Sequence, residues 1–170
     1  MPGRVSQELL DVVDANDTVI DVMPRSEVHR LGLMHRSVHI LVFNGAQAFF
    51  LQKRSMNKDS NPGLWDSSAA GHLDSGEDYL HCAQRELGEE LGIHHPGLLE
   101  PLFHLPACAT TGLEHCTVYR CLHDGPMALQ ADEIEEGAWI PMAEMDSRVA
   151  AEDPALTPIL KLIWQTHLHP

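Results

Sequence analysis

The first part of the chain changes from an extended to a helical hydrophobic pattern. Residues 9–23 carry Val and Ile on both sides of an Asp-Ala-Asn-Asp turn, which predicts a two-stranded hairpin. Beyond Pro24, the apolar positions Val28 and Leu31 have helical spacing, and Ser26 is a candidate N-cap. We therefore expect the region of about 1–34 to form an N-terminal hairpin and a short helix.

The later segments predict a sheet with helices around it. Two β-rich runs, SVHILVF and AQAFFLQKR, are joined by Asn44-Gly45, the strongest short hairpin signal, and we expect them at the centre of the sheet. Three further runs look extended: LLEPLFHLPA, EHCTVYRCL and EGAWIPM. Helices close the chain, the last over about 155–168, where apolar residues follow one stripe.

This order of elements predicts the fold class. Strands, then a long helix, then strands, then helices indicate an α+β sandwich in which helices cover a mixed β-sheet. A chain of 170 residues with 44% hydrophobic residues is long enough for one domain with a core and short for two. We therefore expect a single domain over residues 1–170.

Composition and charge restrict the partners. The chain has 11 basic and 25 acidic residues, and its formal net charge of −14 repels a nucleic-acid backbone, so we expect no nucleic acid polymer as partner. Small phosphorylated molecules stay compatible, because a few basic residues and a divalent ion reverse the field locally. No run has the character of a signal peptide or a membrane span, so we expect a cytoplasmic protein without a membrane partner.

The four cysteines suggest no metal or disulfide framework. Cys82, Cys108, Cys116 and Cys121 form no C-x-x-C pair and have apolar surroundings. We expect reduced, mostly buried thiols. The sequence carries no signal for an oligomeric state.

Three carboxylates crowd one side of the predicted long helix. Glu86, Glu89 and Glu90 stand at i, i+3 and i+4, and like charges so close repel by a few tenths of a kcal/mol per pair. With about 100° of turn per residue, they lie beside an apolar sector that would face the core. That sector contains Leu80, Ala83, Leu87 and Leu91. The carboxylates are then expected at the edge of the core contact, where a cleft could form.

A solvated helix face with an Arg85–Glu89 ion pair explains these acids equally well when the helix is taken alone. The preceding segment GHLDSGE favours a site, because it supplies Gly71 and Gly76 for a tight loop and places Glu77 at its end. Loop and helix together therefore form a candidate constellation.

This constellation resembles the signature of the Nudix hydrolases, G-x5-E-x7-R-E-U-x-E-E-x-G-U. All nine defined positions agree without a gap over residues 71–93. They are Gly71, Glu77, Arg85, Glu86, Leu87, Glu89, Glu90, Gly92 and Ile93. The resemblance implies a Nudix-type α/β/α sandwich, here with an N-terminal hairpin extension, and an enzyme that hydrolyses pyrophosphate bonds.

Closely spaced carboxylates also suit the chemistry that the resemblance implies. Hard carboxylate oxygens bind Mg²⁺ or Mn²⁺, which take further ligands from water and from substrate phosphates. Such an ion neutralises a pyrophosphate and lowers the pKa of an attacking water. By resemblance, Glu89 and Glu90 are the principal metal ligands, and Glu86 is a further ligand or the base.

The resemblance assigns supporting roles to the neighbours of these carboxylates. Arg85 would steer Glu86 through an ion pair. Glu77 would brace the loop or reach a metal through water, and the Gly71 carbonyl is a candidate backbone ligand. Many family members add a carboxylate from a late loop, for which Glu133 or Glu136 is a candidate beside the alternative of a solvated acidic turn.

A wider likeness, from about residue 9 to 142, points to the Nudix branch related to isopentenyl-diphosphate isomerase. It rests on HRSVHILVFN, LQKRS, KDSNPGLWDSSAAGHLDSGE and ALQADEIEEGAWI. His35 and His72 match histidines that bind a second metal in the isomerases. The isomerases use a cysteine just before a Gly-His pair, whereas Ala69 and Ala70 hold that place here. We therefore expect an isomerase-like hydrolase and not an isomerase.

The favoured function is Mg²⁺- or Mn²⁺-dependent hydrolysis of a small phosphoanhydride, either a nucleoside diphosphate linked to another moiety or a nucleoside di- or triphosphate. Lys53, Arg54 and Lys58 are the candidate phosphate contacts. Trp65 is a candidate for stacking on a base or for packing. The alternatives are isomerisation of isopentenyl diphosphate and a non-catalytic, nucleotide-sensing Nudix domain.

Overall fold

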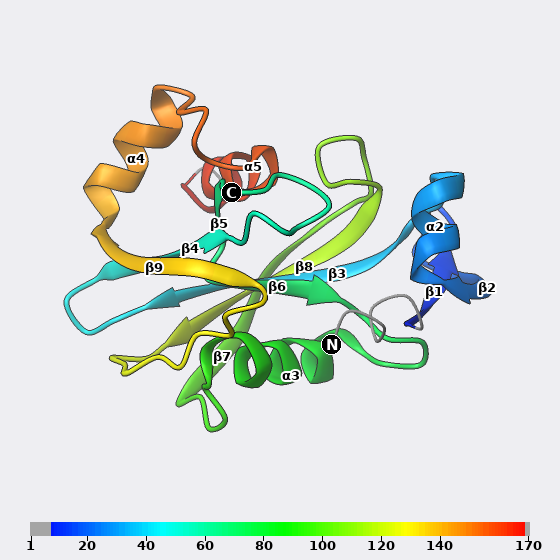
Figure 1. The fold of residues 1–170 in the computed structure, drawn as a ribbon, viewed down its shortest axis with the longest axis horizontal. Helices are drawn as coiled ribbons and strands as arrows, with labels where there is room; N and C mark the ends of the chain where they lie inside the picture. Colours follow the sequence, from blue (N-terminus) through cyan, green and yellow to red (C-terminus); the bar gives the residue numbers. More distant parts are fainter. Residues whose placement is uncertain (1–7, 169–170) are drawn as a thin grey trace.

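The computed structural model describes residues 8–168 (Figure 1). Strands β1 (Leu9–Val13) and β2 (Val19–Pro24) form a two-stranded antiparallel sheet, which is followed by helix α2 (Arg25–Leu31). The expected hairpin and short helix are therefore present. Residues 1–7 of the expected N-terminal segment, and residues 169–170, lie outside the described part of the chain.

Helix α2 begins before the cap that the sequence suggested. Its N-cap is Pro24, with φ −59°, and no side chain caps the helix, so the prediction of Ser26 as N-cap was wrong. Proline fixes a φ that is already suitable for a helix start, and the helix can therefore begin directly after it. Gly32, in the left-handed region at φ 63°, ends the helix.

The main sheet is seven-stranded and mixed. Strands β3 and β8 run parallel at its centre over nine residue pairs, and the other strand pairs are antiparallel. The order is β5-β4-β3-β8-β7, with β6 also on β3 and β9 on β4. The strands are β3 (His35–Phe43), β4 (Ala48–Arg54), β5 (Trp65–Asp66), β6 (Ala69–His72), β7 (Leu98–Leu105), β8 (Glu114–Leu122) and β9 (Ile134–Pro141).

Strands β3 and β4 separate soon after their turn, which the sequence did not indicate. Only Phe43 and Phe49 pair between them, after which β3 pairs with β6 and β4 with β9. The connection covers residues 44–47, and the Asn44 side chain accepts hydrogen bonds from the backbone of Ala46 and Ala48. The separation admits β6, which carries the start of the loop–helix segment to the centre of the sheet.

Helices cover both faces of this sheet, as Figure 1 shows. Helix α3 (Tyr79–Leu91) packs on one face through Ala83, Leu87 and Leu91. Helices α4 (Met142–Ala150) and α5 (Pro158–Leu168) pack on the other face through residues that include Met145 and Trp164. The expected α+β class, with helices over a mixed sheet, is confirmed.

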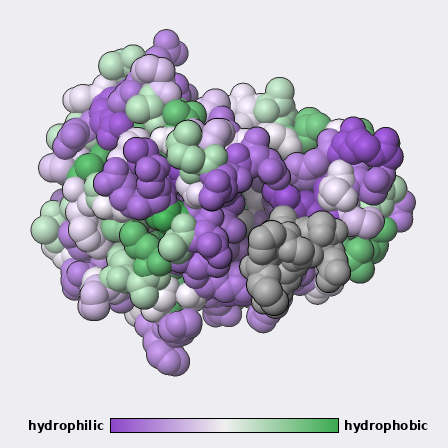
Figure 2. All heavy atoms as spheres, viewed as in Figure 1, coloured by the Kyte–Doolittle hydropathy of each residue, from purple (hydrophilic) through white to green (hydrophobic). Residues whose placement is uncertain are grey.

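Surface and thiols agree with the composition. The face in Figure 2 is mostly hydrophilic, with hydrophobic residues in small groups. Within residues 8–168, no helix is long and apolar enough to cross a membrane. Cys82, Cys116 and Cys121 are buried, Cys108 is exposed, and all four are free thiols, in agreement with the expectation of reduced, mostly buried cysteines.

Candidate active site

The loop between β6 and α3 is fixed at several points. The Ser75 hydroxyl and the Gly76 amide donate hydrogen bonds to the carboxylate of Asp11 on β1, at 2.8 and 3.1 Å. Gly76 adopts φ 81°, which glycine reaches without steric cost. Asp78 caps α3 by accepting the His81 amide at 2.7 Å. The N-terminal hairpin therefore holds the loop, and the helix begins at its own cap.

Arg85 connects this loop to the carboxylates on α3. Its Nε and Nη2 donate to the two oxygens of Glu77, both at 2.9 Å, which is the bidentate geometry of strong ion pairs. Its Nη1 donates to Glu86 at 2.8 Å and to Glu89 at 3.2 Å. Burial opposes ionisation of Glu77, but hydrogen bonds, with Arg85 the strongest donor, lower its pKa to about 2. Glu77 thus fixes Arg85, and Arg85 fixes Glu86.

Replacing Glu77 by Gln should weaken the acid dependence of stability. The pKa of about 2 in the folded protein lies below the ordinary 4.5, so the contribution of Glu77 is complete above about pH 4.5 and is lost as the pH falls through 2. Urea unfolding at a series of pH values should give a shallower loss for E77Q than for the wild type in that window. Asp21→Asn, at an exposed carboxylate on β2, is the control. Equal slopes for E77Q and wild type would contradict the role of Glu77.

Two of the three crowded carboxylates are buried. Glu86 is 9% exposed and Glu90 5%, whereas the Glu89 side chain is 58% exposed. Glu90 accepts hydrogen bonds from the Gln52 amide at 3.0 Å and from the Ala70 N–H at 3.3 Å. Burial raises the pKa of Glu86, and burial together with the neighbouring Glu86 raises the pKa of Glu90 well above its usual range. A cation that joins the pair would remove this penalty on the charged forms.

The buried face of α3 is accordingly rotated from the one that the sequence predicted. Leu80 is 46% exposed, so its assignment to the core was wrong. Cys82, Glu86 and Glu90 follow one another at four-residue spacing and are buried with the apolar sector. In the carboxylate cluster (Glu86, Glu89 and Glu90), Glu86 and Glu90 therefore lie inside the core contact and Glu89 lies in solvent.

Gly71 leaves room for Glu86. A Cβ atom at position 71 would lie 2.2 Å from Glu86 Oε1 and 2.3 Å from its carboxyl carbon, far inside contact distance. The Glu86 carboxylate therefore lies against the backbone of Gly71, whose carbonyl is the expected backbone ligand. Glycine is needed at position 71 because Glu86 lies so close to the backbone, and not because the backbone has a positive φ there.

A pocket of about 480 Å³ opens over these groups. It combines the carboxylate cluster with basic side chains from three other segments of the chain. Arg54 donates to Asp66 at 3.2 Å, Lys58 pairs with Glu133, and Arg25 of α2 lies 3.4 Å from Asp59. The basic residues that line the pocket are Arg25, Arg54, Lys58 and Arg85, and Glu133 also lines it.

Five candidates from the sequence do not line the pocket: Glu77, His35, Lys53, Trp65 and Glu136. Lys53 lies 3.7 Å from Glu135 and 3.9 Å from Glu136 in ion pairs on the neighbouring strands. Trp65 packs against the core under α4 and α5. Of the two late carboxylates, only Glu133 is among the residues around the pocket.

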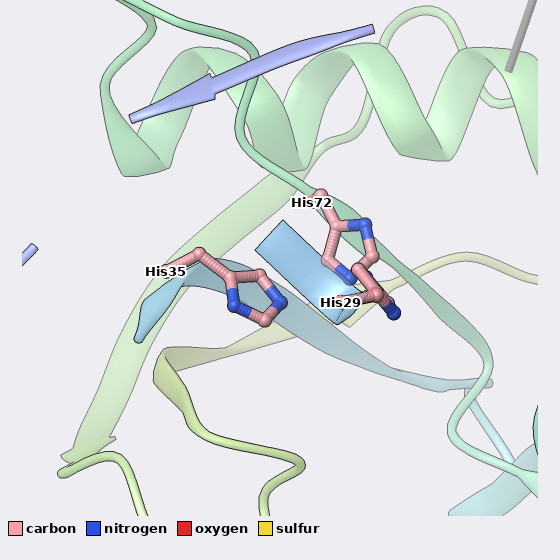
Figure 3. A group of neighbouring side chains, drawn as sticks. All are labelled: His29, His35 and His72. Atoms are coloured by element: carbon pink, nitrogen blue, oxygen red, sulfur yellow. The ribbon is translucent and has the colours of Figure 1, made fainter. Parts of the chain in front are cut away.

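A histidine cluster (His29, His35 and His72) lies beside the carboxylate cluster in the same region. The three rings come from α2, β3 and β6 and turn toward one another (Figure 3), and one nitrogen of each lies within 4.8 Å of the others. His35 Nδ1 contacts the Leu33 carbonyl at 3.0 Å, which makes Nδ1 the donor and leaves a lone pair on Nε2. His35 Nε2 has no hydrogen-bond partner among the described residues.

Glu114 adds a carboxylate to the histidine cluster. Its Oε2 lies 3.1 Å from His72 Nε2 and 3.4 Å from His35 Nε2. Burial opposes the charge, but His72 holds the pKa of Glu114 well below its usual range. Burial lowers the pKa of His29 to about 4, so this imidazole is neutral near pH 7. Neutral imidazoles and a carboxylate are the donor set of a transition-metal site.

Sequence reasoning missed two residues that α2 brings to the pocket, Arg25 and His29. They are spaced i, i+4 on a helix, which was the available signal. It also missed Ser37 and His39 on β3. They alternate with the predicted His35 along the strand, so the three residues share one face.

Comparisons with known proteins agree with this geometry. Residues 33–161 match the family model described as the NUDIX domain. An uncharacterized Nudix hydrolase of Yersinia pestis is 35% identical over 162 residues, which cover 94% of this chain and 86% of that protein. Nudix hydrolase 3 of Arabidopsis thaliana is 39% identical over 168 residues, which cover 91% of this chain and 22% of the plant protein.

Solved structures share the fold. The crystal structure of DR0079 from Deinococcus radiodurans has a TM-score of 0.80 and 26% identity, covering 93% of this chain and 98% of that one. The NUDIX domain of Shewanella oneidensis NrtR, solved with ADP ribose, has a TM-score of 0.61 and 20% identity, covering 86% and 98%, and shows the fold alone. Since the family model spans most of the chain and a relative matches over nearly all of it, this chain belongs to the Nudix hydrolases.

Proposed function

We propose that the protein catalyses the Mg²⁺- or Mn²⁺-dependent hydrolysis of a pyrophosphate bond. The substrate class is a nucleoside diphosphate linked to another moiety, or a nucleoside di- or triphosphate. The observation that carries this proposal is the pocket itself, in which the carboxylate cluster faces Arg25, Arg54 and Lys58. Cation ligands and phosphate donors thus share one cavity.

The carboxylate cluster fits a divalent cation. Nudix enzymes generally use divalent ions, and Glu86 and Glu90 are buried carboxylates whose pKa values are raised chiefly by burial, a cost that a bound cation would reduce. Glu86, Glu89, Glu90 and the Gly71 carbonyl would hold the ion through oxygen, which Mg²⁺ and Mn²⁺ prefer. When bound, the ion would neutralise phosphate charge and make a water more acidic.

The chain's own residues would orient the reactants. Arg85, held by Glu77, keeps the Glu86 carboxylate in place. A carboxylate of the cluster would accept the proton of the attacking water, and Glu133, which lines the pocket, would be the additional acid of the late loop. Lys58 and Arg54 would donate to phosphate oxygens, for which they would exchange their present acidic partners.

Product analysis tests the function. A pocket of about 480 Å³ suits a nucleotide-sized ligand, and the ADP ribose in the Shewanella structure makes that compound a first choice for the panel. The panel combines ADP ribose, nucleoside di- and triphosphates and isopentenyl diphosphate, with products separated by ion-exchange chromatography. Cleavage between two phosphorus atoms is the expected result. Turnover confined to isopentenyl diphosphate, with its allylic isomer as product, would contradict the proposal.

We also infer that the chain belongs to the isomerase-like branch without isomerase activity. Ala69 is buried and Ala70 contributes only a methyl group, so no thiol stands ahead of Gly71. The Cys82 thiol lies 3.5 Å from the His72 carbonyl, and burial raises its pKa, which makes it a poor proton donor for an alkene. The retained signature argues equally against a non-catalytic sensor.

The histidine cluster is proposed as a second cation site. His35 and His72 are the histidines that the isomerase resemblance indicated, and His29 and Glu114 complete the donor set. The orphaned Nε2 of His35 is the observation that supports a ligand there. The two proposed sites differ in their donor atoms. The histidine cluster offers imidazole nitrogens, which suit softer ions such as Co²⁺ or Zn²⁺, whereas the carboxylate cluster offers oxygens.

Spectroscopy with Co²⁺ tests the second site. The visible spectrum of the Co²⁺-loaded protein should show the intense bands of a low-coordinate nitrogen site, and the His35→Ala/His72→Ala double variant should lose them. The E90Q variant, altered only in the carboxylate cluster, is the matched control and should keep these bands. A spectrum that is unchanged in the histidine double variant would contradict the second site.

The N-terminal segment is proposed to be part of the same domain as the Nudix body. Asp11 holds the loop at Ser75 and Gly76, and Arg36 of β3 donates to Asp17 at 2.7 Å. These contacts join the hairpin to the loop and sheet that form the site. We further propose a cytoplasmic location, because four free thiols suit a reducing compartment.

A further inference from the structure

The inward face of β3 is polar where a central strand is ordinarily apolar. His35, Ser37 and His39 share this face and are 3%, 2% and 5% exposed. The same face continues with Leu41 and Phe43, which belong to the core under α4 and α5. Strands buried on both sides usually read as continuous apolar runs, so the polar half of this face needs an explanation.

The Ser37 hydroxyl on this face of β3 is an unsatisfied hydrogen-bonding group. Its hydroxyl is buried and has no hydrogen-bond partner within the described residues, yet Ser37 lines the pocket. Its polar neighbour on β8 is the Cys116 thiol, which is a weak hydrogen-bonding group. A buried hydroxyl without a good partner is unfavourable, and a ligand that bonds to it would remove that cost.

His39 supplies a second neutral group next to Ser37. Its Nδ1 lies 2.8 Å from the Ser67 hydroxyl, which leaves Nε2 as the ring atom for a ligand, and burial lowers the pKa of the imidazole. The adjacent Asp66 accepts hydrogen bonds from the Ser67 amide and the Thr157 hydroxyl. Its other oxygen accepts from Arg54. Ser37 and His39 on this face of β3 therefore offer hydrogen bonds from uncharged groups.

We propose that Ser37 and His39 form a subsite for a neutral hydrogen-bonding group of the substrate, carried by a nucleobase edge or by sugar hydroxyls. This deepens the proposed function and rests on it, since it assigns the polar moiety attached to the diphosphate. A phosphate is better served by Arg25, Arg54 and Lys58 in the same pocket. A hydrocarbon chain would leave the Ser37 hydroxyl without a partner.

Binding of monophosphates tests the subsite without hydrolysis, because these compounds contain no pyrophosphate bond. The probes are AMP, CMP, GMP, UMP, ribose 5-phosphate and methyl phosphate, titrated calorimetrically. We expect a nucleotide or ribose 5-phosphate to bind more tightly than methyl phosphate. Ser37→Ala should weaken that binding about fivefold, the worth of one neutral hydrogen bond. Ribose 5-phosphate separates recognition of the sugar from recognition of the base.

Stability and control variants separate a ligand subsite from a structural role. Because the Ser37 hydroxyl is unsatisfied, Ser37→Ala should keep or raise the melting temperature while it weakens binding. His39→Gln should weaken binding of the same ligand. Neither substitution should change the binding of methyl phosphate. Ser147→Ala, at an exposed serine of α4, is the matched control and should change nothing.

The subsite and the proposed function fail in different ways. If pyrophosphate hydrolysis is present but no probe binds better than methyl phosphate, or Ser37→Ala and His39→Gln leave that binding unchanged, the subsite is overturned and the hydrolase function stands. If base- or sugar-dependent binding is present and weakened by Ser37→Ala while no pyrophosphate is cleaved, the proposed function is overturned and the binding subsite stands.

Discussion

Substitution of Glu90 by Gln is expected to lower metal-dependent hydrolysis by about 10³-fold, or ~4 kcal/mol of transition-state stabilisation, while the protein stays folded. Glutamine preserves the volume and can still accept the hydrogen bond from Gln52 or from the Ala70 amide. It removes the charge that the cation needs at the most buried position of the carboxylate cluster. Steady-state kinetics with Mg²⁺ measure the loss.

Thermal unfolding with and without cation shows that the loss is local. In chelator, E90Q should be at least as stable as the wild type, because Glu86 and Glu90 repel each other in their charged forms. Adding Mn²⁺ should raise the melting temperature of the wild type more than that of E90Q. Glu135→Gln, at an exposed carboxylate outside the pocket, should behave as the wild type. Unchanged turnover in E90Q would exclude Glu90 from the metal site.

Substitution of Gly71 by Ala is expected to lower activity by at least about 10²-fold and to destabilise the fold by about 1–3 kcal/mol, the usual range for overpacking. The new methyl group would meet Glu86 Oε1 at 2.2 Å, so Glu86 must move away from the loop and from Arg85. Kinetics and urea unfolding measure the two effects.

A second glycine offers the matched control for this change. A Cβ at Gly97 meets nothing within 4 Å, and Gly97 has no positive φ, so Gly97→Ala should leave both activity and stability near wild type. If Gly71→Ala retained full activity, Glu86 would not depend on its contact with the loop, and the geometry proposed for the cluster would be wrong.

The fold class followed from the sequence because its signals are local. Turn residues, alternation and helical stripes identified the hairpin, α3, the later strands and α5. The early separation of β3 from β4 did not follow, because strand pairing depends on contacts that are distant in sequence. Asn44-Gly45 marks where the chain reverses, and it contains no information about β6 entering beside β3.

The site was predictable to the extent that it is contiguous. Residues 71–93 carry their own loop, cap and ion pairs, so the resemblance of this one segment was enough to relate Arg85 to Glu86. The burial of Glu86 and Glu90 could not be predicted in this way. Helical spacing gives the direction of a side chain, but it does not tell which neighbouring segment covers that side chain. Gln52, which bonds Glu90, lies 38 residues away in the sequence.

The remaining differences between the predicted and the observed site concern residues that separate helices and strands contribute. Arg25 and His29 reach the pocket only because α2 lies beside β3 and β6, and their helical spacing fits a solvated face as well. For Trp65 the sequence left stacking on a base and packing open, and the structure shows packing, because Trp65 on β5 lies against the core under α4 and α5.

The central claim is that a cation held by the carboxylate cluster drives pyrophosphate hydrolysis, and hydrolysis in ¹⁸O-labelled water tests it most directly. The protein is incubated with ADP ribose and with nucleoside di- and triphosphates in the presence of Mg²⁺, Mn²⁺ or chelator. The masses of the products are measured by mass spectrometry. We predict turnover of at least one compound, ¹⁸O in one phosphate product, and complete loss of turnover in chelator. Turnover that persists in chelator, or its absence with every compound in a folded protein that binds Mn²⁺, would contradict the claim.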